Sequence, residues 1–123
     1  MGDTVPRPIR TFRDLLVWQK AIKLAKAIYQ ITRTFPTDEK FGLTLQLRRA
    51  AVSVSSNFAE GHARQGREFA HFLSIARGST AEIESQLFLA AELGFVTPQA
   101  IESIICLAGE IHRMAASLKE KLA

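Results

Sequence analysis

The sequence has 123 residues, a length typical of one domain with a single core. Its one cysteine, Cys106, excludes an internal disulfide and favours a reduced, cytoplasmic compartment. No apolar run approaches the roughly 20 residues of a membrane span, and residues 1–10 lack the apolar stretch of a signal peptide. A secreted disulfide scaffold and a membrane-spanning protein are thus excluded, and no membrane partner is expected.

Charge is unevenly distributed along the chain, whose net charge is +4. Residues 1–50 carry ten Lys/Arg against four Asp/Glu, whereas residues 51–100 carry three against five. A basic N-terminal part favours an anionic partner such as RNA or DNA. The alternative is a solvated helix face that only keeps the protein soluble.

Residues 1–10 are predicted to be a flexible N-terminal arm, and residues 11–123 a single domain. Thr11 is the expected N-cap of a first helix that runs to about Arg33. Apolar residues form two neighbouring stripes on this helix, one of Trp18, Ile22, Ala25, Tyr29 and Thr32 and one of Val17, Leu24, Ile28 and Ile31. Their joint arc of about 180° is wider than one core requires, which predicts a second contact with another subunit.

Three further helices are predicted. Pro36 ends the first helix, the second runs over about 38–60 with Gly61 as its stop, and 62–66 form a loop. The third covers about 67–93, and the fourth runs from an N-cap at Thr97 to about Lys119. Their expected inward residues are Leu43, Leu47, Ala50, Val54 and Phe58; Phe69, Phe72, Ala76, Ile83, Leu87 and Ala90; and Ile101, Ile104, Ala108, Ile111, Ala115, Leu118 and Leu122. Without strand-like alternation, the pattern predicts an all-α, up-down-up-down antiparallel four-helix bundle.

Known catalytic signatures are missing from the sequence. Glu68 and His71 match half of a di-iron motif, but His112 has Gly109 where the second acid is required. Cys106 lies opposite the apolar seam of its helix and is interpreted as a small packing residue. We therefore expect no enzyme activity, no catalytic residue, no metal and no cofactor.

Small polar and charged residues recur at helical spacing on the second and third helices. These are Arg49, Ser53, Asn57 and Glu60, and then Ser79, Glu82 and Gln86. We expect a buried structural network that fixes helix register, with Arg49 paired to Glu60 or Glu82. A binding or catalytic pocket around Asn57, Glu60 and Glu82 is the alternative.

The candidate nucleic-acid-binding residues are basic side chains of the first helix and of the loop between the second and third helices. They are Arg10, Arg13, Lys20, Lys23, Lys26, Arg64 and Arg67. Such side chains bind phosphates largely independently of sequence. The eight Phe fall mostly on core stripes, so exposed aromatic side chains for base stacking are not expected.

Two central motifs, AVSVSSNFAEG at 51–61 and FLSIARGSTAEIESQL at 72–87, resemble the bacterial four-helix-bundle proteins encoded in intervening sequences of 23S ribosomal RNA genes. FRDLLVWQKA at 12–21 and LQLRRA at 45–50 match as well. The resemblance implies a homopentamer without enzymatic activity, similar to the accessory protein of diversity-generating retroelements, which binds nucleic acid and a reverse transcriptase. It also marks Arg49, Ser53, Asn57, Glu60, Gly61, Gly78, Ser79 and Glu82 as packing and network residues.

The sequence thus predicts a cytoplasmic, non-enzymatic homo-oligomer that binds RNA or DNA backbone through its basic residues. A protein-assembly scaffold that recruits a partner protein, without direct nucleic-acid contact, is the alternative.

Overall fold

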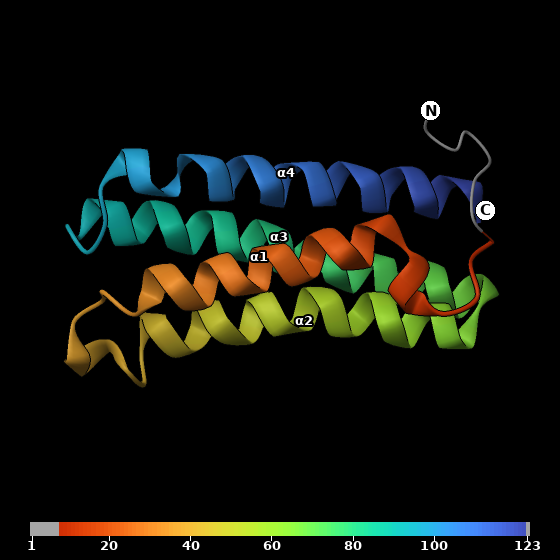
Figure 1. Ribbon diagram of the computed structural model, residues 1–123, viewed down its shortest axis with the longest axis horizontal. Helices are drawn as coiled ribbons and strands as arrows, with labels where there is room; N and C mark the ends of the chain where they lie inside the picture. The colour runs from red at the N-terminus through yellow and green to blue at the C-terminus, as the bar shows by residue number, and fades with distance from the viewer. Residues whose placement is uncertain (1–7, 123) are drawn as a thin grey trace, which may run out of the picture.

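Four long helices make up a computed structural model of the protein, which describes residues 8–122. They run up-down-up-down (Figure 1), and residues 8–122 contain no strand, which confirms the predicted all-α bundle. The helices are α1 (Leu16–Thr32), α2 (Leu43–Arg64), α3 (Gly66–Glu92) and α4 (Pro98–Lys121). Short 3₁₀ helices, η1 (Phe12–Asp14) and η2 (Thr37–Glu39), precede α1 and α2. Most of the predicted arm, residues 1–7, lies outside the described residues.

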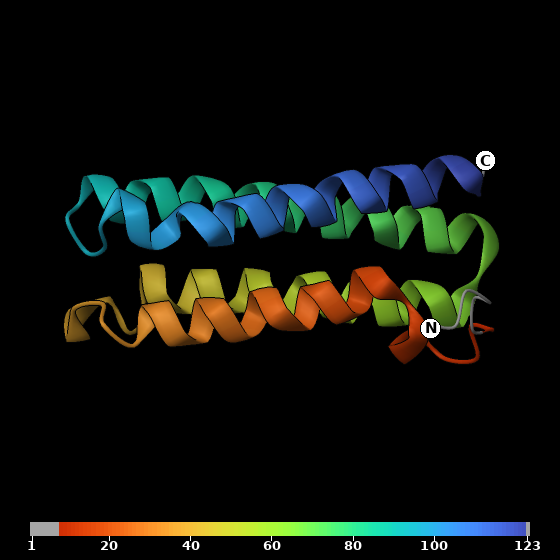
Figure 2. The ribbon, with the colours of Figure 1, turned by 45° about the horizontal axis from the view of Figure 1, so that its top comes forward.

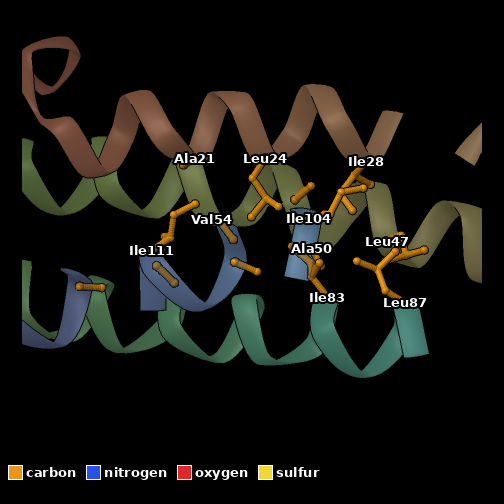
Figure 3. Close-up of a cluster of buried hydrophobic side chains, with 14 of the residues drawn as sticks. Ala21, Leu24, Ile28, Leu47, Ala50, Val54, Ile83, Leu87, Ile104 and Ile111 are labelled. Carbon is orange, nitrogen blue, oxygen red and sulfur yellow. The ribbon is translucent and has the colours of Figure 1, made fainter. Parts of the chain in front are cut away.

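The core runs along the centre of the bundle, and every helix contributes to it (Figure 3). Leu24 and Ile28 of α1 meet Leu47 of α2 and Ile83 of α3 there, all with no exposed surface. Full burial of such a side chain is worth about 1.5–3 kcal/mol. The predicted inward positions of the last three helices are all buried or partly buried, the partly buried ones being Phe72, Leu118 and Leu122.

The bundle has two layers, one of α1 and α2 and one of α3 and α4 (Figure 2). Among neighbouring pairs of long helices, α2 and α3 pack most extensively, and α1 and α4 pack least extensively. The α1–α2 and α3–α4 connections lie at one end of the bundle, and the α2–α3 connection lies at the other (Figure 1). The N-terminal half of the chain therefore forms one face of the molecule, and the C-terminal half forms the other.

The first helix does not run continuously from Thr11, as predicted. Thr11 caps η1 instead, by accepting the backbone N–H of Arg13, and Asp14 completes a capping box by accepting the N–H of Thr11. Leu15 then adopts an extended conformation (ψ 124°), and α1 begins at Leu16. The sequence signal was a true cap, but the cap belongs to a separate 3₁₀ turn.

The second helix runs past its predicted stop. Gly61 is buried inside α2, where a Cβ would lie 2.9 Å from both Cδ1 of Phe69 and Cβ of Phe72. This glycine thus permits close approach of α2 and α3, which overrides its usual tendency to end a helix. The predicted loop at 62–66 shrinks to Gln65, whose φ of 67° turns the chain before α3 begins at Gly66.

The second helix also begins later than the predicted residue 38, because Thr37–Glu39 form η2 and α2 starts at Leu43. The helix ends at the α3–α4 connection follow the sequence signals closely. Gly94, just past α3, has a φ of 78°, the left-handed conformation typical of a glycine beyond a helix C-terminus. Thr97 caps α4 by accepting the backbone N–H of Ala100 at 3.1 Å, and Pro98 is its first residue.

Candidate nucleic-acid interface

Lys23 and Lys26 project from α1 into solvent. The sequence from Leu15 to Thr37 contains no Asp or Glu, so α1 supplies no acid of its own to neutralise these two lysines. Their positions, three residues apart, place both ammonium groups near the same side of the helix. This pair is the part of the predicted interface that the fold leaves most open to a phosphate.

Lys20 differs from the other two lysines of α1. Its Nζ lies 3.1 Å from Oε2 of Glu110 on α4, and its side chain is only 24% exposed. The ion pair joins α1 to α4, the least extensively packed of the neighbouring pairs of long helices. Because its ammonium group is already paired with Glu110, Lys20 is a weaker candidate for phosphate binding than Lys23.

Arg10 and Arg13 gather around η1, where they line a shallow pocket together with Thr11, Asp14 and Trp18. Backbone N–H groups of Arg10 and Thr11 donate to the Asp14 carboxylate, and these hydrogen bonds lower the pKa of Asp14 below its ordinary value. The carboxylate lies beside both arginines and offsets part of their positive charge. The contribution of η1 to an anion-binding surface is reduced accordingly.

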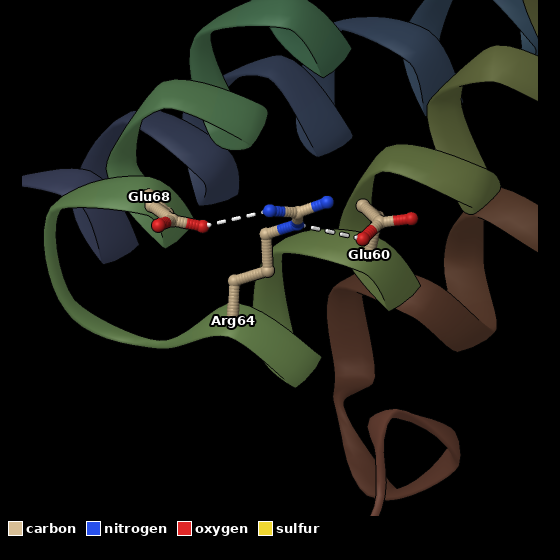
Figure 4. Close-up of polar contacts among 3 residues, drawn as sticks. All are labelled: Glu60, Arg64 and Glu68. Atoms are coloured by element: carbon tan, nitrogen blue, oxygen red, sulfur yellow. Dashed lines mark hydrogen bonds and ion pairs between the residues drawn. The ribbon is translucent and has the colours of Figure 1, made fainter.

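Arg64 is held by two carboxylates at the α2–α3 connection (Figure 4). Its Nε donates to Glu60 at 2.8 Å and its Nη1 to Glu68 at 3.1 Å. The hydrogen bond with Glu60, followed by the one with Glu68, raises the pKa of Arg64. With Arg67 exposed nearby, the α2–α3 connection carries two cations and two anions, so this connection forms no basic patch.

The structure adds basic residues that the sequence analysis did not select. Arg48 on α2 stacks over the ring of Tyr29 on α1, with its guanidinium carbon 4.6 Å from the ring centroid. Its Nε donates to Thr32 Oγ1 at 2.9 Å. Arg33, just past the end of α1, and Arg49 on α2 are exposed. The sequence did contain a signal for the arginines of α2, because the segment 40–59 that includes them has no Asp or Glu.

Two exposed aromatic rings are present, contrary to the prediction of none, although the other six Phe residues are buried or partly buried as predicted. Phe41 is 81% exposed, with Lys40 Nζ 5.5 Å from its ring centroid, and Phe88 is 56% exposed. Phe41 follows η2 in the connection before α2 begins, so helical periodicity did not apply to it.

The predicted polar network exists only in part. Asn57 Nδ2 donates to Ser53 Oγ at 2.9 Å, and Ser79 Oγ donates to the same oxygen at 3.0 Å, so α2 and α3 are joined. Gln86 Nε2 donates to Gln46 Oε1 at 3.3 Å instead of to the serines.

The charged members of that set lie on the surface. Among the described residues Arg49 forms no ion pair, although pairing with Glu60 or Glu82 was predicted, because Glu60 binds Arg64. Arg49 and Glu82 line an open groove with Ser53 and Ser79. In place of the expected buried network, the structure has a hydroxyl–amide cluster beneath exposed charged side chains. Gly78, which was predicted to be a packing residue, has open space where a Cβ would lie.

Groups that could support catalysis or metal binding are sparse. Within residues 8–122 no three His, Cys, Asp or Glu side chains are grouped to hold a metal ion. Cys106 is exposed, so its interpretation as a packing residue is wrong. His112 bridges α3 and α4, with Nδ1 3.0 Å from Thr80 Oγ1 and Nε2 3.3 Å from Arg77 Nη2. None of the helices in this part of the chain has the length and apolarity to cross a bilayer.

Charge is segregated between the two layers of the bundle. Residues 10–64, which include α1 and α2, carry ten Lys/Arg and four Asp/Glu, whereas residues 66–122 carry five and seven. The N-terminal layer is thus net +6 and the C-terminal layer net −2. A field of this kind attracts an anionic partner to the α1–α2 side.

Comparison with known proteins supports the resemblance seen in the sequence. Residues 13–117 match the family described as 23S rRNA-intervening sequence protein. A crystal structure of a protein with unknown function from the S23 ribosomal protein family of Bacteroides thetaiotaomicron is similar, with a TM-score of 0.75 and 26% identity. The match covers 85% of this chain and 98% of that one. No curated protein matches the chain. The chain belongs to the 23S rRNA-intervening sequence protein family.

Proposed function

We propose that the protein is a non-enzymatic, cytoplasmic homo-oligomer that binds the backbone of RNA or DNA through α1. The observation that carries this proposal is the charge segregation, with Lys23 and Lys26 exposed on a helix that contains no acid. Arg33, exposed just past the C-terminal end of α1, extends the same positive surface.

Ammonium and guanidinium groups of this kind bind phosphates by charge and release condensed counterions. Binding is therefore expected to depend steeply on salt and weakly on nucleotide sequence. Further phosphate contacts would come from Arg10, Arg13 and Arg67. Lys20 and Arg64 would contribute less, because both already form ion pairs with carboxylates.

Self-association is supported by apolar side chains that the single chain leaves in solvent. Ile22 and Tyr29 of α1 are 42% and 40% exposed, and Val52 beside them on α2 is 45% exposed. Tyr29 and Val52 line one groove between the two helices. Ile22 and Tyr29, which belong to the same apolar stripe of α1, are thus available for contact with another subunit. We retain the homopentamer that the family resemblance implies.

Fluorescence anisotropy with labelled structured RNA and with duplex DNA, across a salt series, tests the binding proposal. We expect submicromolar binding at low salt and a linear fall of log affinity with log salt concentration. Light scattering on the same sample tests the assembly. A monomeric mass at micromolar concentration would contradict the oligomer, and no binding at the lowest salt would contradict the nucleic-acid function.

A protein-assembly scaffold is the second candidate function. The exposed rings of Phe41 and Phe88, together with Leu93 at 54% exposure, favour it because protein interfaces are enriched in aromatic side chains. This function predicts recruitment of a protein partner that salt weakens little. Loss of that recruitment in Phe41→Ser, with no nucleic-acid binding by the parent, would favour the scaffold.

A further inference from the structure

A second groove lies on the opposite layer from the α1–α2 surface. It runs between the end of α3 and the start of α4, and its lining includes Phe88, Ile101 and Ile105, with Cys106 also among its residues. Phe88 is 56% exposed there. Glu92 and Glu102 are its charged lining residues. This α3–α4 groove is an apolar surface with a negative rim.

The groove between α1 and α2 has the opposite charge. It is lined by Tyr29, Leu45, Arg48, Arg49 and Val52. Arg48 is fixed by its contacts with Tyr29 and Thr32, whereas Arg49 is exposed and has no ion-pair partner among residues 8–122. This α1–α2 groove is an apolar surface with a positive rim.

We propose that the α1–α2 groove of one copy of this chain binds the α3–α4 groove of the next copy. The inference rests on the proposed self-association and assigns its two surfaces. A two-fold contact would place each groove against itself and bring Arg48 and Arg49 against the same residues of the other copy. Head-to-tail contact instead places arginines against Glu92 and Glu102, and apolar lining against apolar lining.

The two grooves also lie at the same level along the bundle. Val52 is nine residues into α2 and Cys106 is eight residues into α4, and both helices begin at the same end of the molecule (Figure 1). At 1.5 Å per residue, both positions lie about 12–14 Å from their helix starts. Copies can therefore contact side by side without an axial shift, as a closed ring of subunits requires.

Cys106 gives a direct test because it is the only cysteine of the chain and is exposed at the α3–α4 groove. Val52→Cys places a second thiol in the α1–α2 groove. With a short bismaleimide, V52C is expected to give a ladder of covalent oligomers, and mass spectrometry should identify peptides joined between positions 52 and 106. The parent and V52C/C106S, each with one thiol, should give no crosslink.

Strong crosslinking of V52C/C106S would overturn the proposal, because it would mean that α1–α2 grooves face each other. Light scattering of each variant distinguishes a failure of the groove pairing from a failure of self-association. An uncrosslinked oligomer of V52C would disprove the pairing of the grooves alone, whereas a monomeric parent would disprove self-association as well.

Charge exchange provides an independent test that needs no crosslinker. Arg49→Glu and Glu102→Arg are each expected to weaken assembly at least tenfold, and the R49E/E102R double variant to recover most of that loss. Light scattering over a dilution series measures the effect. Equal assembly by all three variants would contradict the pairing, and circular dichroism checks that each variant remains helical.

Discussion

Gly61 of α2 lies so close to Phe69 of α3 that an added Cβ would come within 2.9 Å of the ring carbon Cδ1. Phe69 is 5% exposed, so its ring has little room to move away. We predict that Gly61→Ala destabilises the bundle by about 1–3 kcal/mol, the usual cost of overpacking a core. Urea denaturation measures this change, and an unaltered midpoint would mean that the two helices separate easily.

Gly78 provides the matched opposite case. It lies in the middle of α3 and is exposed, and beyond its own turn of helix nothing lies within 4 Å of the position of an added Cβ. Because glycine weakens a helix interior, Gly78→Ala should stabilise the protein by about 0.5–1 kcal/mol. The same denaturation series provides the measurement. A loss of stability accompanied by a fall in assembled mass would instead reveal close contact with another copy at this site.

The sequence predicted helix number and type well because apolar periodicity is strong in all four helices. The prediction failed for one glycine, because glycine can either end a helix or allow two helices to approach closely. The sequence alone does not distinguish these two roles. Gly94 adopts a left-handed conformation beyond α3, whereas Gly61 lies inside α2. Only the position of Phe69, which depends on the tertiary packing of α3, separates the two cases.

Ser79 and Ser53 form a hydroxyl pair that joins α3 to α2 at 3.0 Å. Ser79→Ala should cost about 1 kcal/mol, because Ser53 Oγ still accepts from Asn57 after the change. Nucleic-acid affinity and its salt dependence should not change. A selective loss of binding in a fully stable S79A variant would show that the cluster is a ligand site and not a structural one.

Asp14 provides a pH-dependent element at the start of the bundle. Because hydrogen bonds lower its folded pKa below the ordinary 3.8, its stabilisation is complete above that value and is lost as pH falls toward the folded pKa. Trp18, the single tryptophan, packs edge-on against Phe12 of η1 at 5.1 Å and reports on this turn. We predict an acid transition in Trp18 fluorescence that is absent in Asp14→Asn, where the amide does not titrate. The same transition in both proteins would assign it to another group.

The candidate interface was only partly predictable from sequence. Helical spacing placed Lys23 and Lys26 together on α1, and both are exposed. The same spacing could not show that Glu110, 90 residues after Lys20, lies 3.1 Å from it. Long-range ion pairs depend on how helices pack, so a count of cations along the chain overstates the free positive charge.

The salt dependence of nucleic-acid binding by two charge-matched double variants tests the central claim most directly. Lys23→Gln/Lys26→Gln removes two charges from α1, and Lys119→Gln/Lys121→Gln removes two from α4. For duplex DNA, each lost phosphate contact lowers the slope of log affinity against log salt by about 0.9. We expect the α1 variant to lose about 1.8 from the slope and the α4 variant to retain the parental slope. Equal slopes for the two variants would contradict binding through α1.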